Sequence, residues 1–406
     1  MTRPSLRAAC GTTLTVASIL LGGCTLLAEP WRGRKAEPPP AAPEVPQWPD
    51  PVATHRFEID EKVDIVGVLQ KTIVGKEDTL SDIARRFDVG YEDMVRANPG
   101  VDPWLPGVGR EVIVPSQFIL PNAPRKGVVI NVAAMRLYYF PPRKPDEKQV
   151  VYTYPIGIGR VGWATPEGAT KVMRKQKDPV WRPPASVRKE HAENDDPLPA
   201  LVPAGPDNPL GNRAMYLGWP SYLIHGTNKP YGVGLRSSHG CIRLYPEDIE
   251  KLFEDVPVGM SVQVVNQPFT FGWQGSALYL QAYDILEDDP RDWKKAQKKL
   301  LSRSLAQRIQ QELKSQARTV DWEAIAQLSH DPRGIPVPVS SPGVTLDTVL
   351  AAVGIVANRV PADSNWDGLT DLPVDEETFR EMMSDSDPEV SPAPVTQPAA
   401  QQKSRT

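Results

Sequence analysis

Short runs of β-branched and aromatic residues, separated by turns, recur between residues 128 and 265 and constrain the fold most strongly. Such runs are typical of β-strands. The predicted strands are residues 128–132, 136–140, 150–154, 214–218, 222–225 and 261–265. One amphipathic helix lies between the last two predicted strands, with Pro246 in its first turn and Ile249, Leu252 and Phe253 on its buried face. The sequence therefore predicts a mainly β fold, a sandwich or barrel with one helix.

The length of the chain, 406 residues, is too great for one hydrophobic core and predicts two or three domains. A net charge of −4 is mild, so it implies no polyanionic partner such as a nucleic acid. The chain contains 44 prolines, which cluster at the two ends and in loops. Proline-rich ends of this kind indicate linkers on either side of a folded part.

The N-terminus has the pattern of a secretory signal peptide over residues 1–23, with Arg3 and Arg7 before a short apolar stretch. That stretch is too short to span a bilayer as a helix. It ends in Leu21-Gly22-Gly23-Cys24, which resembles the lipobox of bacterial lipoproteins. The resemblance implies acylation of Cys24 and, because position 25 is not Asp, a periplasmic protein anchored to the outer membrane. A plain cleaved signal peptide is the alternative.

Residues 24–58 are rich in proline and alanine and lack apolar periodicity, so we expect a semi-extended linker. The end of the chain, residues 384–406, has low complexity and is expected to be disordered. Between residues 268 and 383 we expect a partly helical accessory region. It contains a strand at 278–282, a basic helix over 292–318 and a short helix near 346–353. The basic helix either packs on its neighbour or contacts a membrane surface or an acidic partner.

Residues 59–118 show the order strand, helix, helix, strand. Thr79 or Asp78 can cap the first helix, whose apolar face recurs at helical spacing from Leu80 to Phe87. The second helix ends near Asn98, and a strand follows at 111–115. This β-α-α-β unit resembles the lysin motif, which implies binding of N-acetylglucosamine-containing glycan. A lysin-motif fold used only as a spacer is the alternative.

The stretch from Ile224 to Leu244 carries the chemistry. Cys241 has His239 two residues before it and His225 sixteen residues before it. A cysteine nucleophile needs an imidazole to take and return its proton, and Gly240 allows backbone N–H groups to approach a developing oxyanion. The alternative is a buried cysteine acting as a small hydrophobic residue. The polar neighbours of Cys241 make a poor core sequence, which favours the catalytic interpretation.

The spacing leaves the choice of base open. If the chain is extended at the motif, His239, Cys241 and Arg243 share one face, and His239 could be the base. Residues 222–225 form a separate predicted strand, whose end could equally place His225 beside the thiol.

The sequences His225-Gly226-Thr227-Asn228 and Ser238-His239-Gly240-Cys241-Ile242-Arg243-Leu244 resemble the active-site signature of the bacterial L,D-transpeptidases. The resemblance extends upstream through residues 165–168, 178–184 and 205–211, and covers about residues 124–267. It implies an L,D-transpeptidase-type β-sandwich or barrel that uses no cofactor and no metal ion. It also favours a lid over the donor peptide in the long loop at 180–209.

The resemblance assigns roles to residues of the motif. His225 becomes the proton donor and acceptor, and backbone groups of His239, Gly240 and Cys241 face the oxyanion. Arg243 is a candidate to hold a substrate carboxylate. The other residues expected to contact substrate are Ser238, Thr227 and Asn228.

The implied reaction is attack of the cysteine on the diaminopimelate carbonyl of a peptidoglycan tetrapeptide stem, with loss of the terminal D-alanine. An amine then resolves the thioester. The amine is either the lysine of an outer-membrane lipoprotein or a second diaminopimelate, which gives a 3–3 cross-link. The alternatives are a hydrolase of the same fold that uses water, an L,D-carboxypeptidase or amide hydrolase, and a non-catalytic wall-tethering protein.

Overall fold

The computed structural model describes residues 47–305, 307–315, 320–341 and 343–368. The chain divides into the units Met1–Pro46 and Gln47–Thr406, and the description below concerns the second unit. The predicted signal peptide, Cys24, most of the linker and the tail at 384–406 lie outside the described residues. Within the described ranges, no helix combines the length and the apolar character needed to cross a bilayer.

A nine-stranded sheet dominates the middle of the chain, in the order β1-β8-β7-β6-β15-β10-β11-β12-β14. Its strands are β1 (Arg56–Ile59), β6 (Gly127–Asn131), β7 (Arg136–Phe140), β8 (Gln149–Pro155), β10 (Gly168–Lys177), β11 (Arg213–Leu217), β12 (Leu223–His225), β14 (Ile242–Arg243) and β15 (Ser261–Val265). The pairs β6–β15 and β12–β14 are parallel, and the other pairs are antiparallel.

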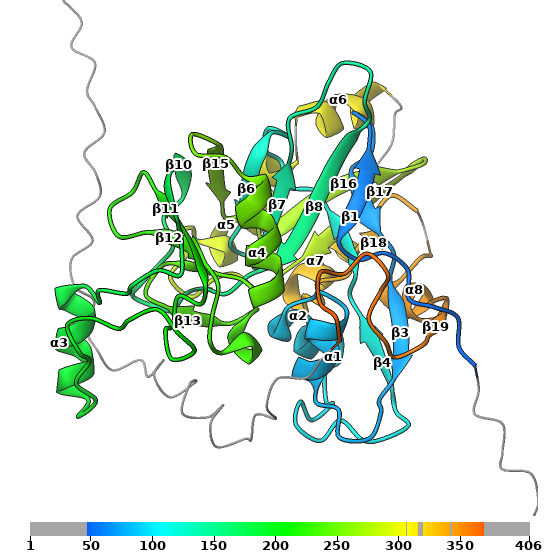
Figure 1. Ribbon diagram of the computed structural model, residues 1–406. Coiled ribbons are helices and arrows are strands. Elements are labelled where there is room, and N and C mark those ends of the chain that lie inside the picture. Colours follow the sequence, from blue (N-terminus) through cyan, green and yellow to red (C-terminus); the bar gives the residue numbers. More distant parts are fainter. Residues whose placement is uncertain (1–46, 306, 316–319, 342, 369–406) are drawn as a thin grey trace, which may run out of the picture. The chain divides into compact units, whose positions relative to one another are not determined.

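Strand β10 joins the two halves of this sheet. Its first residues pair with β15, its later residues pair with β11, and the register shifts between Val172 and Arg174. A bulge of this kind bends a strand, and apolar side chains from both halves pack in one core with the helix α4 (Pro246–Asp255). Figure 1 shows α4 beside β11 and β12. The mainly β prediction is confirmed, with a second helix, α3 (Ala185–Glu193), in the loop expected to act as a lid.

The β-α-α-β order of the N-terminal module is confirmed. It consists of β3 (Gln70–Ile73), α1 (Leu80–Arg86), α2 (Tyr91–Ala97) and β4 (Glu111–Val114). Thr79 is the cap of α1, in a reciprocal capping box with Asp82. Its core is continuous with the outer face of β6, β7 and β8, through Val129, Tyr138 and Val151. The module therefore packs directly on the large sheet.

Shorter elements complete the fold. They are β2 (Ile65–Gly67), β5 (Gln117–Ile119), β9 (Ile158–Gly159), η1 (Pro230–Gly232), β13 (Arg236–Ser238), β16 (Phe269–Gln274), β17 (Ala277–Ala282), α5 (Trp293–Ser304), α6 (Gln307–Ser315), α7 (Trp322–His330), β18 (Val337–Pro338), α8 (Leu346–Ala351) and β19 (Ile355–Val356). The hairpin β16–β17 and the helices α5, α6 and α7 form a separate apolar core, which is the partly helical C-terminal region predicted from the sequence.

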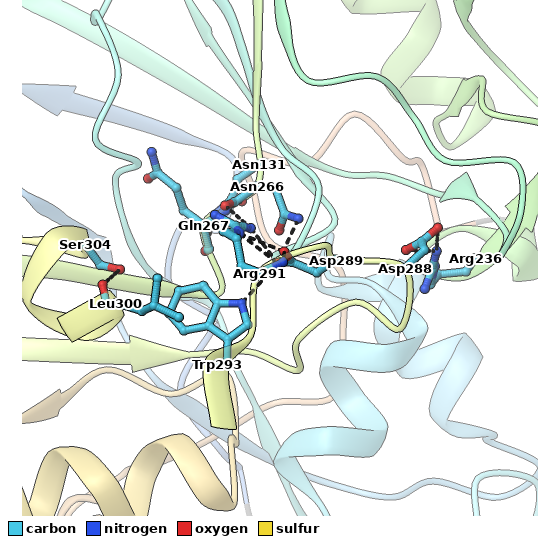
Figure 2. Close-up of polar contacts among 10 residues, drawn as sticks. All are labelled: Asn131, Arg236, Asn266, Gln267, Asp288, Asp289, Arg291, Trp293, Leu300 and Ser304. Carbon is cyan, nitrogen blue, oxygen red and sulfur yellow. Dashed lines mark hydrogen bonds and ion pairs between the residues drawn. The ribbon is translucent and has the colours of Figure 1, made fainter. Parts of the chain in front are cut away.

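A network of polar side chains fastens this C-terminal region to the end of β15. Figure 2 shows the Asp289 carboxylate as its centre, with bonds from Arg291, from the indole of Trp293 at 3.2 Å and from Asn266 at 3.3 Å. The side chain of Asp289 is completely enclosed, and Arg291 holds its pKa below the usual range despite the opposing effect of burial. The start of α5 is therefore fixed by a charge-assisted network.

The structure contains strand β10, which was not predicted from the sequence, and it differs from expectation at two further segments. The expected linker to residue 58 runs into β1, which pairs with β8 from Arg56↔Tyr152 to Ile59↔Gln149. The prediction of one continuous helix over 292–318 is wrong, because α5 ends at Ser304 and Leu305 has an extended ψ of 121° before α6 begins. Leu305 and Ile309 are both buried, so the break turns two short apolar faces onto the same core.

Candidate active site

The predicted base His225 ends strand β12, and the predicted nucleophile Cys241 directly precedes β14, the neighbouring parallel strand. The register pairs Ile224 with Ile242 and His225 with Arg243. Both isoleucines are buried in the main core. Since side chains alternate along a strand, His225 and Arg243 project from the opposite face, and so does Cys241, two residues before Arg243.

Cys241 is partly exposed and is a free cysteine. Its Sγ lies 3.5 Å from the backbone oxygen of Ser221, and its side chain packs against Leu223 and Leu210. Burial raises the pKa of the thiol to about 11, opposed by a backbone contact at Leu223 and by the charge of Arg243. The resting form of Cys241 is therefore the neutral thiol, which needs a base to become a nucleophile.

His225 is almost fully enclosed, at 3% exposure. Its Nδ1 lies 2.6 Å from the backbone oxygen of Gly226. A carbonyl only accepts, so Nδ1 carries the proton and Nε2 is left with its lone pair. Burial, and then the charge of Arg243, lower the pKa of His225 to about 3. The neutral imidazole thus has one fixed tautomer, and the Gly226 carbonyl is the orienting group that the sequence did not reveal.

His239 has different partners. Its Nε2 lies 3.0 Å from Nη2 of Arg160 and 3.1 Å from the Glu190 carboxylate, and its ring stacks edge-on against Trp163. Burial, followed by the charge of Arg160, lowers the pKa of His239 to about 3. Because two polar groups already engage its Nε2, this geometry favours His225 over His239 as the base. The assignment stays a prediction.

The turn at Gly240 is shaped by its neighbours. Gly240 has a φ of +94°, and a Cβ there would lie 2.7 Å from Cε1 of Tyr222. The Thr165 hydroxyl donates to the Gly240 oxygen at 3.0 Å, and the hydroxyl of Ser238 donates to the Cys241 oxygen at 2.6 Å. Two side-chain donors therefore hold the backbone on both sides of the nucleophile.

The predicted substrate contacts are placed unequally. Arg243 donates from Nη1 to the hydroxyl of Ser237 at 3.1 Å, and burial lowers its pKa. Thr227 is buried and accepts from the backbone of Lys229 at 2.9 Å, whereas Asn228 is exposed. The buried hydroxyl of Ser238 is turned to the backbone. Asn228 is therefore the predicted contact residue that is exposed. The side chains of Arg243, Thr227 and Ser238 each form a hydrogen bond within the protein.

The helix α3 reaches the motif through Glu190, which pairs with Arg160 as well as with His239. His191 on the same helix bonds Asp196 at 2.9 Å, and its ring centre lies 6.1 Å from that of His239. Figure 2 shows a second ion pair near the motif, between Arg236 and Asp288 at 2.8 Å. Arg236 begins β13, so this pair holds the strand that ends at Ser238. Sequence reasoning did not single out Arg160, Glu190 or Tyr222, since none of them lies in the motif.

These features define a β-rich protein with a cysteine–histidine site and an attached β-α-α-β module. A family model described as the L,D-transpeptidase catalytic domain matches residues 125–264, and one described as the LysM domain matches residues 72–115. The chain belongs to the L,D-transpeptidase family. The chain spans about three fifths of the length of the first curated relatives that it matches. The family predicted from the motif is confirmed.

Two curated relatives come from Escherichia coli strain K12. "Probable L,D-transpeptidase ErfK/SrfK" is 49% identical over 193 residues, which is 47% of this chain and 61% of the relative. "Probable L,D-transpeptidase YcfS" is 39% identical over 253 residues, 60% of this chain and 76% of the relative. The NMR structure of the catalytic domain from the E. faecium L,D-transpeptidase is 23% identical, covers 36% of this chain and 99% of that chain, and has a TM-score of 0.26.

Proposed function

We propose that this protein is an L,D-transpeptidase that acts on tetrapeptide stems of peptidoglycan through a thioester on Cys241. The observation that carries the proposal is the position of Cys241 directly before β14, the parallel neighbour of the strand β12 that ends in a neutral, tautomer-fixed His225. Both groups are uncharged at rest, so a proton can pass between them when substrate arrives.

In the first step, Nε2 of His225 takes the thiol proton of Cys241, and Sγ attacks the carbonyl carbon at the L-centre of diaminopimelate. The carbon–nitrogen bond to the terminal D-alanine breaks. Its nitrogen leaves with the proton from His225, and the stem remains as a thioester. Backbone N–H groups at Gly240 and Cys241 face the oxyanion. The hydrogen bonds from Thr165 and Ser238 hold this turn, so the N–H groups are in place before the oxyanion forms.

In the second step, an acceptor amine attacks the thioester carbon and the carbon–sulfur bond breaks. The proton released by the amine passes through His225 to the departing sulfur. As acceptor we propose the lysine of a small outer-membrane lipoprotein, since the upstream sequences at 165–168, 178–184 and 205–211 resemble the subgroup with that activity. The amine of a second diaminopimelate, giving a 3–3 cross-link, is the competing acceptor.

The lysin-motif module would hold the enzyme on the glycan strands. Its helix α1 is joined to the start of α4 by the ion pair of Arg85 with Glu247 at 2.9 Å. The backbone of Tyr91 in α2 donates to the Val233 oxygen at 3.2 Å. A glycan held by this module would therefore lie at a fixed place relative to the catalytic motif, rather than on a flexible tether.

The lipid anchor is part of the same proposal. Acylation of Cys24 would place the protein in the periplasm at the outer membrane, with the proline-rich segment as spacer. In a fractionation experiment, the unaltered protein is expected with the membranes and Cys24→Ser in the soluble fraction or uncut. Recovery of the unaltered protein without acyl chains in the soluble periplasm would contradict the anchor and leave the catalytic proposal untouched.

Mass spectrometry of muropeptides tests the reaction. The protein is incubated with tetrapeptide-bearing disaccharides and a lysine-terminated peptide, with Cys241→Ala as the control. Release of D-alanine with a new amide on the stem is expected for the active protein alone. Tripeptide products without a new amide indicate the hydrolase, and no product indicates the non-catalytic tether, so either result overturns the transpeptidase proposal.

A further inference from the structure

Three buried side chains outside the active site converge on one point. His55 precedes β1, Asp88 follows α1, and Asp248 lies in the first turn of α4. One nitrogen or oxygen atom from each lies within 4.8 Å of the others, and Nδ1 of His55 is 3.1 Å from Oδ2 of Asp88. Asp248 is only 2% exposed, and the other two residues are as deeply buried. Segments far apart in the sequence have thus placed two carboxyls and an imidazole together.

The hydrogen bonds of this cluster are incomplete. Among the described residues, Oδ2 of Asp248 and the buried hydroxyl of Tyr154 have no hydrogen-bond partner. The ring of Tyr154 packs edge-on against His55, with 4.7 Å between ring centres. The guanidinium of Arg136 donates to the backbone oxygen of Asp88 and to Thr153. Buried polar atoms without partners cost free energy, so their convergence points to a missing ligand.

The outer contacts hold the cluster in position. The side-chain amide of Asn365 lies 3.0 Å from Oδ1 of Asp248 and 3.3 Å from Nε2 of His55. The Asp363 carboxylate accepts the backbone N–H groups of Thr54, His55 and Arg56 at 2.9 to 3.2 Å. The Asn365 amide nitrogen is a donor towards both atoms, so it holds Oδ1 of Asp248 and the His55 ring in place.

We propose that His55, Asp88 and Asp248 bind a divalent transition-metal ion, with zinc as the best match. One imidazole nitrogen and two carboxylate oxygens suit zinc, whereas calcium and magnesium prefer oxygen ligands alone. Zinc bonds of about 2.0–2.2 Å place tetrahedral ligand atoms about 3.4 Å apart, close to the 3.1 Å between Nδ1 of His55 and Oδ2 of Asp88. The other ligand atoms lie within 4.8 Å, so small side-chain shifts would complete this spacing. The family resemblance implied no metal ion, and these three residues lie in separate segments of the sequence.

Charge supports the same assignment. Two carboxylates lie together in this buried cluster, and their negative charges repel each other. A divalent cation would balance both charges. The ion would be structural, since it joins the segment before β1, the lysin-motif module, α4 and the stretch around Asn365. It is separate from the chemistry at Cys241.

The test uses the full chain with Cys10, Cys24 and Cys241 all replaced by alanine, so that no thiol can hold the ion. After dialysis with zinc and removal of free zinc, elemental analysis is expected to give one zinc per chain. Chelation is expected to lower Tm by several degrees. Adding Asp248→Asn should lower zinc affinity at least 10-fold, whereas His191→Ala, which removes the imidazole of an outer His–Asp pair, should leave it unchanged.

X-ray absorption by the zinc-loaded chain checks the ligands without a ligand-site variant, which covers the case in which Asp248→Asn does not fold. Nitrogen and oxygen neighbours with one imidazole are expected. Absence of bound zinc would overturn the proposal and leave three groups that share protons. A zinc ion lost in His191→Ala but kept in Asp248→Asn would overturn it as well.

Discussion

The carboxylate of Glu190 lies 3.1 Å from Nε2 of His239, although 49 residues separate them in the sequence. The same carboxylate pairs with Arg160, and the side chains of Glu190 and Arg160 are at most 16% exposed. The helix α3 is thus fastened to the motif by a single acidic side chain with two partners. Removing this charge should loosen the helix without touching Cys241 or His225.

Glu190→Gln is therefore expected to increase hydrogen–deuterium exchange across residues 185–193 by about tenfold, since charge-assisted bonds contribute about 1.5–3 kcal/mol. Glu193→Gln is the matched control. It lies on the same helix, where Glu193 pairs with Lys189 in an exposed i,i+4 pair that contributes little. Equal exchange in the two variants would show that Glu190 does not hold α3.

The sequence predicted the capped helix α1 and the strands β6, β7, β8, β11, β12 and β15, but not β10, because those elements depend on local patterning. The apolar stripe of α4 and the capping box of Thr79 and Asp82 are examples. Strand β1 was missed because it follows a proline-rich segment, and its strand pairing is with β8, a segment distant in the sequence. The break at Leu305 was also missed, since the apolar stripe runs through it and tertiary packing decides where the helix ends.

In the candidate site, too, the sequence predicted what a local motif marks and missed the contacts that depend on folding. The motif marked His225 at the end of β12 and Cys241 directly before β14, the parallel neighbour of β12. The sequence could not show that the Gly226 carbonyl fixes the His225 tautomer, because that contact depends on a side-chain rotamer. It also could not show that Glu190 meets His239, because this contact joins two segments through folding alone.

The nucleophile is tested by acylation with a carbapenem, followed by intact-protein mass spectrometry. One adduct is expected on the unaltered protein and none on Cys241→Ala, whose circular dichroism should be unchanged. His225→Ala should slow acylation by about 10²-fold or more, the usual contribution of a positioned base. A larger loss in His239→Ala than in His225→Ala would reverse the assignment of the two histidines.

Burial of His225 predicts how stability depends on pH. Its pKa is lowered from 6.5 to about 3 in the folded protein, so between these values the unfolded chain binds the proton and the folded chain does not. The free energy of unfolding therefore falls as the pH drops below 6.5, by up to about 1.4 kcal/mol for each pH unit.

Urea unfolding of the unaltered protein and of His225→Gln, at a series of pH values, measures this effect. The unaltered protein should lose more stability on acidification than the variant, and the two should run parallel above pH 6.5. Parallel curves throughout the acid range would mean that His225 is protonated in the folded state.

The turn before the nucleophile gives the last prediction. Gly240 and Gly259 have similar backbone angles, with φ of +94° and +90°, so alanine is strained at both, by about 1–2 kcal/mol. They differ in space, since a Cβ at Gly240 would press on Tyr222 at 2.7 Å and one at Gly259 would meet nothing within 4 Å. Gly259→Ala should lower Tm and leave acylation of Cys241 unchanged.

Gly240→Ala should lower Tm to a similar degree and also slow acylation at least 10-fold, because the displaced turn moves the Cys241 backbone away from the bond donated by Ser238. The measurement is the rate of carbapenem adduct formation beside a thermal melt of each variant. An acylation rate for Gly240→Ala equal to that of Gly259→Ala would show that the turn tolerates a side chain and that its shape does not set the reactivity of Cys241.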